Sequence, residues 1–507
     1  MAVTDSLLAS FERIVEEDFG KGVTQATKDI DPWSKKLVDS SMGVARDGLG
    51  KNWKKIQVFK TGLAGAATWR SVVGPAPVTG TTANDKFTTY GTAAAFTAPQ
   101  TFPGAEQITF PSYVQSEVQL KEMYGNFQVP VEVMRIDMIP TNVGNHFEAI
   151  LEGASRRVAL REILAFWAHS QSTLGTSSGA YVTGVASQNI TCDAGGDWSG
   201  TSTAITNSDG ITRYDLLRLQ DGECVDIWEW SGAAWVKLNG TVPYFVALTD
   251  DLGISFKLVG FSGSDVTLTS GRTFELHPFG SATGSTTTTI TSNQPTPLSG
   301  WIKSSGTVFG LNLANYPFFK SLVKALSAGE QVLTEQVLNR YINGFLTSKP
   351  HAGRIDTLVT TPGVKSKYVN NLDFTGRRDR FAMPVSLNEG YTEKWNYQRD
   401  GYELMVETSN FCPEGNLYGL VMRNGNIKKI TPPQPGGVGK HPKFGEYVEF
   451  FGKITGNSIF VPVRDNTASR GSFTDWVEAP FKRWLEYMPD SFCGVRLTGL
   501  AEDIASS

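Results

Sequence analysis

The stretch "LTEQVLNRYINGFLTSKPHAGRIDTLVTTPGVKSKYVNNL", from Leu333 to Leu372, decides the fold class. It predicts a helix over Leu333–Phe345, a polar break, an apolar strand over Thr357–Thr361 and a helix near Val364–Leu372. Such an alternation occurs in many nucleotide-binding enzymes and also in proteins that have no active site. The residues at the turns of this segment indicate which of these two classes of protein the chain belongs to.

The turn after the predicted strand lacks the glycines of a dinucleotide site. It reads Pro362-Gly363-Val364, a single glycine with a proline that suits the start of a helix. Two other Gly-Lys pairs, in "GLGKN" (48–52) and "GGVGKHP" (436–442), lack the upstream glycine and the Ser or Thr of a phosphate loop. We therefore expect no nucleotide phosphate site.

No spacing typical of a catalytic or metal centre occurs elsewhere in the sequence. There is no G-x-S-x-G elbow, no H-E-x-x-H and no C-x-x-C. His146 and Glu148 are two residues apart, so they do not share a helix face, and Asp250-Asp251 is best interpreted as a surface turn. We expect no enzymatic activity, no catalytic residue, no cofactor and no metal.

Three tryptophans, Trp228, Trp230 and Trp235, lie in a predicted hairpin over Cys224–Leu238. Two aromatic rings on one strand face are able to stack on a sugar, with acidic residues nearby. Large aromatic residues are also ordinary on a half-buried strand. Packing is the favoured interpretation, and sugar binding is the alternative.

Length and composition indicate a large protein rich in β-structure. The 507 residues correspond to two to four domains, or to one fold with large insertions. Hydrophobic residues make up 40% and charged residues only 19%, and the 52 glycines indicate many turns.

The charge pattern argues against a protein that grips nucleic acid. The net charge is −4 and no basic block stands out, whereas sequence-independent binding needs a concentrated positive surface. A surface that only faces packaged nucleic acid is compatible with this composition. The sequence has no secretory signal and no run of 18 apolar residues, so no membrane association is expected. The scattered cysteines favour free thiols in a reducing compartment.

The first part of the chain predicts extended elements that cannot hold a core of their own. An amphipathic helix is predicted over residues 4–19, and a second short helix over Asp31–Ser41. Residues 43–128, rich in Gly, Ala, Thr and Pro, predict a long two-stranded excursion with flanking β-prone pieces such as Ile56–Phe59 and Gln107–Phe110. We expect this arm to reach another subunit.

The rest of the chain combines one long helix with many strands. Residues 141–171 carry the strongest helical pattern, about 45 Å at ~1.5 Å per residue, which suggests a scaffold strut. Residues 175–305 are β-rich. Further helices are predicted over Asn315–Leu326 and Thr474–Tyr487, and two strands within Gly401–Ile430 are joined by a Cys-Pro-Glu-Gly turn.

The order of these elements resembles that of the major capsid proteins of tailed bacteriophages with the Hong Kong 97-like (Johnson) fold. Leu333–Leu372 carries the resemblance most specifically, because a segment of this kind belongs to that family's central axial domain. "VETSNFCPEGNLYGLVMRNG" (406–425) looks like the family's closing strands. The resemblance implies an α+β fold with an N-terminal arm, an extended β loop, a long spine helix, an axial domain and an additional β-rich insertion.

The resemblance also implies a division of the chain. The expected parts are an N-terminal arm (1–42), an extended loop with flanking strands (43–128), a peripheral domain with the spine helix (129–174), a β-rich insertion or enlarged domain (175–305), an axial domain (306–450), and C-terminal strands with a helix (451–507).

The implied function is that of a self-assembling structural subunit of a phage head. Such a protein forms hexamers and pentamers in an icosahedral shell, encloses double-stranded DNA without sequence-specific binding, and has scaffolding, portal and decoration proteins as partners. It is located in the virion capsid after assembly in the host bacterial cytoplasm. The alternatives are a tail sheath or tube protein, an encapsulin-type shell, or a β-rich carbohydrate-binding protein.

Opposite charges suggest where subunits meet. The N-terminal helix is acidic and the start of the predicted loop is basic. The expected inter-subunit contact residues are Phe11, Lys51, Lys54, Lys55 and Lys60. Reversing Lys54 and Lys55 to Glu is expected to impair assembly and to leave the subunit folded. No motif aligns a specific Lys–Asn pair, so the crosslinks of some relatives are not predicted.

Overall fold

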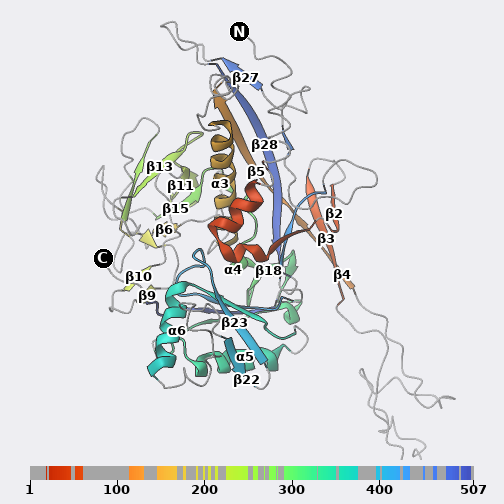
Figure 1. The fold of residues 1–507 in the computed structure, drawn as a ribbon, viewed down its shortest axis with the longest axis vertical. Coiled ribbons are helices and arrows are strands. Elements are labelled where there is room, and N and C mark those ends of the chain that lie inside the picture. Colours follow the sequence, from red (N-terminus) through yellow and green to blue (C-terminus); the bar gives the residue numbers. More distant parts are fainter. Residues whose placement is uncertain are drawn as a thin grey trace, which may run out of the picture.

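Figure 1 shows the computed structural model, an α+β protein with several sheets and few helices. The structure describes residues 19, 22–40, 42–46, 52–60, 113–130, 146–167, 175–177, 190–191, 198–199, 204–206, 212–214, 224–248, 255–260, 268, 273–280, 282–283, 291–327, 329–349, 353–374, 396–399, 402–422, 426–433, 449–450, 461–464, 475–489 and 493–503.

The longest pairing in the molecule joins β5 (Lys121–Pro130) to β28 (Asp475–Met488). Their antiparallel register runs from Trp476↔Pro130 to Leu485↔Lys121. Alternate side chains of a strand point to the same side, and the alternate positions of this β5–β28 ribbon that face the core are apolar. Its buried residues include Phe127, Val129, Val477, Ala479 and Phe481.

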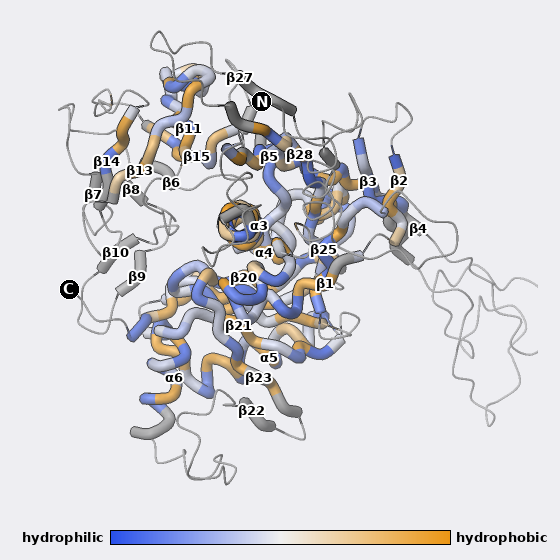
Figure 2. Tube along the Cα trace, turned by 45° about the horizontal axis from the view of Figure 1, so that its top comes forward, coloured by the Kyte–Doolittle hydropathy of each residue, from blue (hydrophilic) through white to orange (hydrophobic). Residues whose placement is uncertain are grey.

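Two helical segments cover this apolar face. The strut helix α3 spans His146–Trp167, which confirms the predicted helix over these residues, and residues 141–145 and 168–171 lie outside the described residues. Residues 22–30 are also helical, and Val23 and Ala26 belong to the same core cluster as α3 and the ribbon. Figure 2, which looks nearly along α3, shows this helix between the ribbon and the sheet that contains β21.

The prediction of a helix over Thr474–Tyr487 is wrong, because this segment is the 14-residue strand β28. Its apolar spacing also fits a helix, but Pro480 lacks the N–H that a helix interior needs and its ring clashes with the preceding turn. The buried residues Val477, Ala479 and Phe481 have a period of two. Pairing with β5 decides the conformation.

A six-stranded sheet with the order β20-β29-β24-β21-β23-β22 forms the lower part of the view in Figure 1. Its strands are β20 (Leu322–Ala325), β21 (Thr357–Thr360), β22 (Asn396–Arg399), β23 (Tyr402–Thr408), β24 (Leu417–Leu420) and β29 (Val495–Thr498). The helices α5 (Glu335–Ser348) and α6 (Pro362–Phe374) complete this part. The helix–strand–helix prediction for Leu333–Leu372 is confirmed.

Local chemistry explains why this segment was predictable. Thr334 caps α5 by accepting a hydrogen bond from the Val337 backbone N–H, at 3.2 Å. The strands β23 and β24 are joined by the predicted turn, but β21 lies between them, parallel to β23 and antiparallel to β24. The turn therefore joins two strands that do not pair with each other.

The predicted helix over Asn315–Leu326 is wrong. The segment holds a short 3₁₀ helix, Pro317–Phe319, followed by β20, which runs parallel to β29. Leu322 is aligned with Val495 in this pair. A distant sheet edge therefore overrides the local helical pattern.

The predicted helix over Asp31–Ser41 is wrong over Leu37–Ser40. Pro32–Lys36 form a 3₁₀ helix, and Leu37–Ser40 form β1, which is parallel to β25 (Ile427–Ile430). β25 pairs with β28, so β1 extends the sheet of the ribbon. The same sheet includes β26 (Glu449–Phe450) and β27 (Val461–Arg464).

The β-rich prediction for residues 175–305 is confirmed by an eight-stranded sheet, on the left in Figure 1. Its strands are β6 (Gly175–Ser177), β7 (Ile190–Thr191), β8 (Trp198–Ser199), β11 (Cys224–Trp230), β12 (Trp235–Lys237), β13 (Tyr244–Leu248), β14 (Ser255–Val259) and β15 (Thr273–Pro278). The predicted hairpin is β11–β12, with Trp230 opposite Trp235.

Three two-stranded pairs and one short helix complete the described elements of this region. They are β9 (Ala204–Thr206) with β10 (Thr212–Tyr214), β16 (Ala282–Thr283) with β17 (Thr291–Ser292), β18 (Thr307–Val308) with β19 (Leu311–Asn312), and the helix α4 (Leu298–Trp301).

The base of the predicted two-stranded excursion forms an arm at the right of Figure 1, and residues 61–112 between its two strands lie outside the described residues. β3 (Trp53–Lys60) pairs with β4 (Tyr113–Gln119), and the short β2 (Val44–Arg46) adds a third strand. The β-prone piece Ile56–Phe59 is part of β3. The pieces at residues 4–18 and Gln107–Phe110 lie outside the described residues, and the domain boundaries stay predictions.

Candidate subunit-contact surface

The arm has two different faces. Along β4, Ser116 and Leu120 are buried and Val118 is half-buried, whereas Gln115, Glu117 and Gln119 are exposed. Consecutive residues of a strand point to opposite sides, so one face docks on the body and the other faces solvent. For the same reason, the side chains of the neighbouring residues Lys54 and Lys55 in β3 point to opposite faces of the arm.

Lys54 lies on the solvent face and pairs within its own arm. Its Nζ is 2.8 Å from Glu117 Oε2, and the two side chains are 26% and 45% exposed. The hydrogen bond from Lys54 lowers the pKa of Glu117 from its ordinary value. Exposed pairs of this kind contribute little to stability, so this pair is free to exchange for another partner.

Lys55 lies on the docked face and is 6% exposed. Its ammonium group donates a hydrogen bond to the Met42 carbonyl oxygen. Burial, with a smaller effect from Lys428, lowers the pKa of Lys55. A Glu at this position would place a buried carboxylate next to the Met42 carbonyl oxygen. Both groups are hydrogen-bond acceptors, so the negative charge would be buried without a donor there. The burial of Lys55 therefore argues against the expectation that reversing Lys54 and Lys55 together leaves the subunit folded, and this expectation stays a prediction.

The side chains of the other three predicted contact residues lie outside the part of the chain that the structure describes. Phe11 and Lys51 lie outside the described residues, and Lys60 is in β3 although its side chain is not described. The inter-subunit role of all five residues stays a prediction, because one chain does not test it.

An apolar cluster fixes the base of the arm. Leu120 belongs to a buried group with Trp301, Phe309 and Trp484, and Trp53 of β3 packs against it. These residues come from the arm, the 298–319 segment and β28. The arm is thus rooted in the body where three parts of the chain meet.

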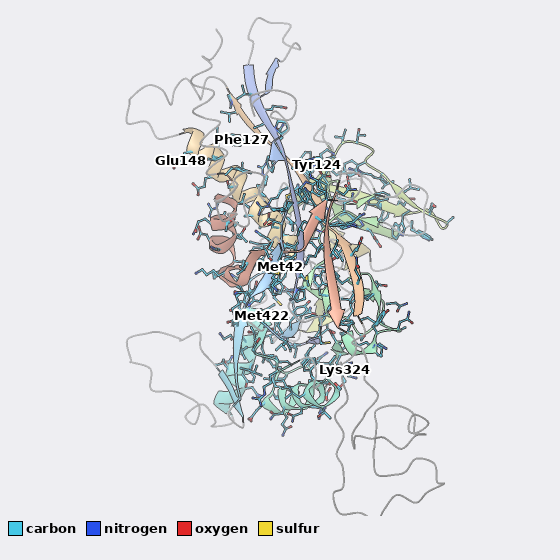
Figure 3. All side chains as sticks on the ribbon, turned by 90° about the vertical axis from the view of Figure 1, so that its right-hand side faces the viewer. Met42, Tyr124, Phe127, Glu148, Lys324 and Met422 are labelled. Atoms are coloured by element: carbon cyan, nitrogen blue, oxygen red, sulfur yellow. The ribbon has the colours of Figure 1, made fainter. Side chains whose placement is uncertain are left out.

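The outer face of the ribbon carries a polar and aromatic surface. Tyr124 is 63% exposed (Figure 3) and is aligned with Lys482 across the β5–β28 pair. Lys482 lies 3.7 Å from Glu122 and 5.6 Å from the Trp484 ring centroid. Partial burial and a hydrogen bond with Glu122 raise the pKa of Tyr124 to about 12.

A buried ionic network joins α3 to the ribbon sheet, and the sequence analysis missed it. Glu162 of α3 lies 2.5 Å from Arg483 Nε and 3.2 Å from Lys429 Nζ, and all three side chains are at most 4% exposed. The Tyr487 hydroxyl donates to the Glu162 carbonyl oxygen at 2.7 Å. Burial raises the pKa of Glu162, but Arg483 and Lys429 lower it overall. The signal was a glutamate within the apolar "EILAFW" of the predicted helix.

Asp31 is a second buried connector. Its carboxylate accepts hydrogen bonds from Trp167 Nε1 at 3.3 Å and from Ser409 Oγ at 2.9 Å. It also accepts from the Ser34 hydroxyl at 3.1 Å. One carboxylate thus joins the N-terminal segment, Trp167 of α3 and Ser409 after β23.

The tryptophan hairpin is a packed element. Trp228 is 1% exposed, and the Trp230 and Trp235 ring centroids are 5.4 Å apart. Asp226, fully buried, accepts from Lys237 Nζ at 2.9 Å and from the Gly280 N–H at 2.8 Å. The packing interpretation is confirmed for Trp228, whose ring is not accessible to a sugar.

The described residues contain no cluster of metal-binding side chains. They hold no group of three or more His, Cys, Asp or Glu side chains that is able to bind a metal ion. A groove of about 320 Å³ lies between residues 22–30 and α3, lined by Ala26 and Leu151 with Asp29, Glu148 and Glu152. In the part of the chain that the structure describes, no helix combines the length and apolarity needed to cross a membrane.

No family model and no curated protein matches this chain. Among solved structures, it is similar to the capsid asymmetric unit of cyanophage A-1(L), with a TM-score of 0.36 and 13% identity over 92% of both chains. The capsid of Myoviridae phage XM1 has a TM-score of 0.28 and 10% identity, with 92% of this chain and 90% of that chain covered. A structure of Mycobacterium phage Patience has a TM-score of 0.31 and 8% identity, covering 100% and 91%.

Proposed function

We propose that the chain is a major capsid protein with a Hong Kong 97-like fold, a self-assembling structural subunit of a tailed-phage head. The observation that carries this proposal is the two-faced arm: β2, β3 and β4 dock one face on the body and expose the other. An element with one face left to solvent suits contact with another copy of the chain.

The proportions of the other elements support a shell subunit. β28 has 14 residues, about 46 Å at ~3.3 Å per residue, and strands in globular proteins usually have 3–10 residues. α3 has 22 residues, about 33 Å. A tile that contacts several neighbours needs long elements of this kind, because obligate interfaces commonly exceed ~2,000 Å².

The proposal includes the assembly and its partners. The chain forms hexamers and pentamers of an icosahedral shell, assembled in the cytoplasm of a bacterial host and retained in the virion. Scaffolding, portal and decoration proteins are its partners, and it has no enzymatic activity. The net charge of −4 suits a shell that encloses DNA without binding a specific sequence.

Electron microscopy with negative staining, together with sedimentation, tests this function on the purified full-length chain. Shells, or rings of five and six subunits, are the expected result. Helical tubes would favour a tail sheath or tube protein. A monodisperse monomer would overturn the capsid proposal.

The ion pair of the arm allows a sharper test of subunit contact. Lys54→Glu removes the pair with Glu117, and the double change Lys54→Glu with Glu117→Lys restores a pair inside the arm. If Lys54 contacts an acidic surface of a neighbour, the double variant stays defective in assembly. If only the pair inside the arm matters, the double variant assembles like the original chain, which would exclude Lys54 as a contact residue.

A further inference from the structure

The two-residue turn of the β18–β19 hairpin has an unusual backbone. Phe309 has a φ of 51° and Gly310 a φ of 76°, and among the described residues Phe309 is the one non-glycine residue with positive φ. Positive φ at both central positions is the pattern of a type I′ hairpin turn, for which Asn-Gly is preferred. A bulky residue in this conformation is strained and persists only where its surroundings stabilise it.

The arm supplies one part of these surroundings. The Ser116 hydroxyl of β4 donates a hydrogen bond to the Phe309 carbonyl oxygen, and Ser116 is 5% exposed. A Cβ atom on Gly310 would lie 3.4 Å from Ser116 Oγ and 3.5 Å from the Glu117 carbonyl oxygen. Both central residues of the turn therefore lie against Ser116 of the arm, and Gly310 also lies beside Glu117.

The body supplies the other part. Phe309 is 4% exposed, and its ring centroid lies 5.5 Å from that of Trp301. The same cluster includes Trp484 of β28 and Leu120 at the base of the arm. Phe309 thus binds the body through its ring and the arm through its carbonyl group.

We propose that the Phe309-Gly310 turn sets the angle at which the arm leaves the body, with Phe309 as the positioning residue. The eight residues of β3 extend about 26 Å at ~3.3 Å per residue, so a small rotation at the base displaces the outer end by several ångströms. Under the proposed function, on which this consequence rests, the arm has to meet a neighbouring copy in a defined direction.

Hydrogen exchange followed by mass spectrometry on the unassembled full-length chain tests the turn directly. Ser116→Ala removes the donor, and Gly310→Ala disfavours the positive φ without changing the arm. Each is expected to raise amide exchange in β3 and β4 about fivefold to tenfold, the effect of losing one hydrogen bond. Exchange in α5 and β21 is expected to stay unchanged.

Two matched controls separate this effect from general destabilisation. Gln115→Ala changes the same strand on its exposed face. Gly232→Ala imposes a comparable backbone cost at φ 97° in the β11–β12 turn, where a Cβ meets no atom within 4 Å. Both controls are expected to leave arm exchange unchanged. The double variant Ser116→Ala with Gly310→Ala is expected to match the larger single effect, because both changes break the same contact.

Phe309→Asn tests the positioning residue itself. Asn tolerates positive φ, so the turn conformation is kept while the ring that anchors it to Trp301 is lost. Its arm exchange is expected to rise as in Gly310→Ala. Unchanged arm exchange in all three variants, or an equal rise in α5 and β21, would overturn the proposal. A wild-type chain that forms no shells would count against the proposed function and leave the exchange result standing.

Discussion

The ribbon region and the lower sheet are stabilised in different ways. The lower core is built from aliphatic and aromatic side chains of neighbouring elements such as α5, β21 and α6. The ribbon region adds a buried ionic network, in which Glu162 of α3 meets Arg483 of β28 and Lys429 of β25. In the lower region the buried Glu502 carboxylate accepts hydrogen bonds from the Thr361 hydroxyl and the Gly415 N–H. The comparison teaches that neutral hydrogen-bond donors satisfy the buried carboxylate of the lower region, whereas the ribbon needs ionic partners for Glu162.

The largest expected effect is the loss of a charge from the ribbon. Arg483→Met leaves Glu162 with only Lys429 as an ion partner in a fully buried place. Removing one partner of a buried pair typically costs about 3–5 kcal/mol. Urea denaturation of the unassembled chain is expected to show this loss, with the ribbon losing exchange protection before α5.

A combined variant checks that the cost comes from a buried charge that has lost its partner. Arg483→Met together with Glu162→Gln and Lys429→Met removes all three charges of the network and is expected to recover part of the lost stability, since no charge of the network stays buried without its partner. A triple variant less stable than Arg483→Met alone would contradict the charge explanation.

The next effect is steric and concerns Gly125 of the ribbon, for which Gly344 of the lower region, discussed below, is the counterpart. In the ribbon, a Cβ on Gly125 would lie 2.3 Å from Cζ of the Phe481 ring, which is directly opposite in the register. Overpacking of this kind costs about 1–3 kcal/mol, and Gly125→Ala is expected near the upper end. The midpoint of urea unfolding measures it, and Gly125→Ala with Phe481→Leu should be less damaging than Gly125→Ala alone.

Glu486 makes the ribbon region sensitive to pH. Its buried carboxylate accepts hydrogen bonds from the Thr296 N–H at 2.7 Å and from the Tyr487 N–H at 3.0 Å. Burial raises its pKa to about 7, against the lowering effects of those N–H groups and of Lys121. The folded chain therefore keeps a proton that the unfolded chain loses above about pH 4.5, so stability falls as pH rises from about 4.5 to 7.

Glu486→Gln is the test of this pH dependence. The amide stays neutral and keeps an acceptor for the two N–H groups, so the decline between pH 4.5 and 7 is expected to shrink. Above pH 7 the variant is expected to be more stable by about 2–3 kcal/mol at most. Unfolding free energies at pH 5 and pH 8 measure the difference, and an unchanged pH slope would rule out Glu486 as its source.

The smallest expected effect is a gain in the lower region. Gly344 lies in α5, where a Cβ would have Leu322 Cδ2 as its nearest neighbour at 3.9 Å. Gly344→Ala is expected to stabilise the chain by about 0.5–1 kcal/mol, because Ala favours the helix and there is room for the methyl group. Thermal unfolding checks the sign, and a loss would show that the lower core is tighter than this distance indicates.

The sequence identified elements whose stabilising contacts are local. The helices α5 and α6 follow from apolar periodicity, from the Thr334 cap and from Pro362, all within a few residues of the elements they define. The hairpin β11–β12 follows from alternation and turn residues in the same way. In the arm, the predicted piece Ile56–Phe59 lies in β3, whereas its partner β4 begins at Tyr113, beyond the predicted piece Gln107–Phe110. For the candidate contact surface, the sequence found the arm but placed Lys54 and Lys55 together.

Tertiary structure decided the elements whose partners are distant. β28 is a strand because β5 lies beside it, and β1 and β20 are strands because β25 and β29 offer them an edge. Helical hydrogen bonds close within four residues, so local sequence predicts a helix such as α5 where no distant strand edge overrides the pattern. A strand forms its hydrogen bonds with another segment of the chain. A buried charge such as Glu162 likewise finds its ion-pair partners on another segment. Neither partner is visible until the chain has folded.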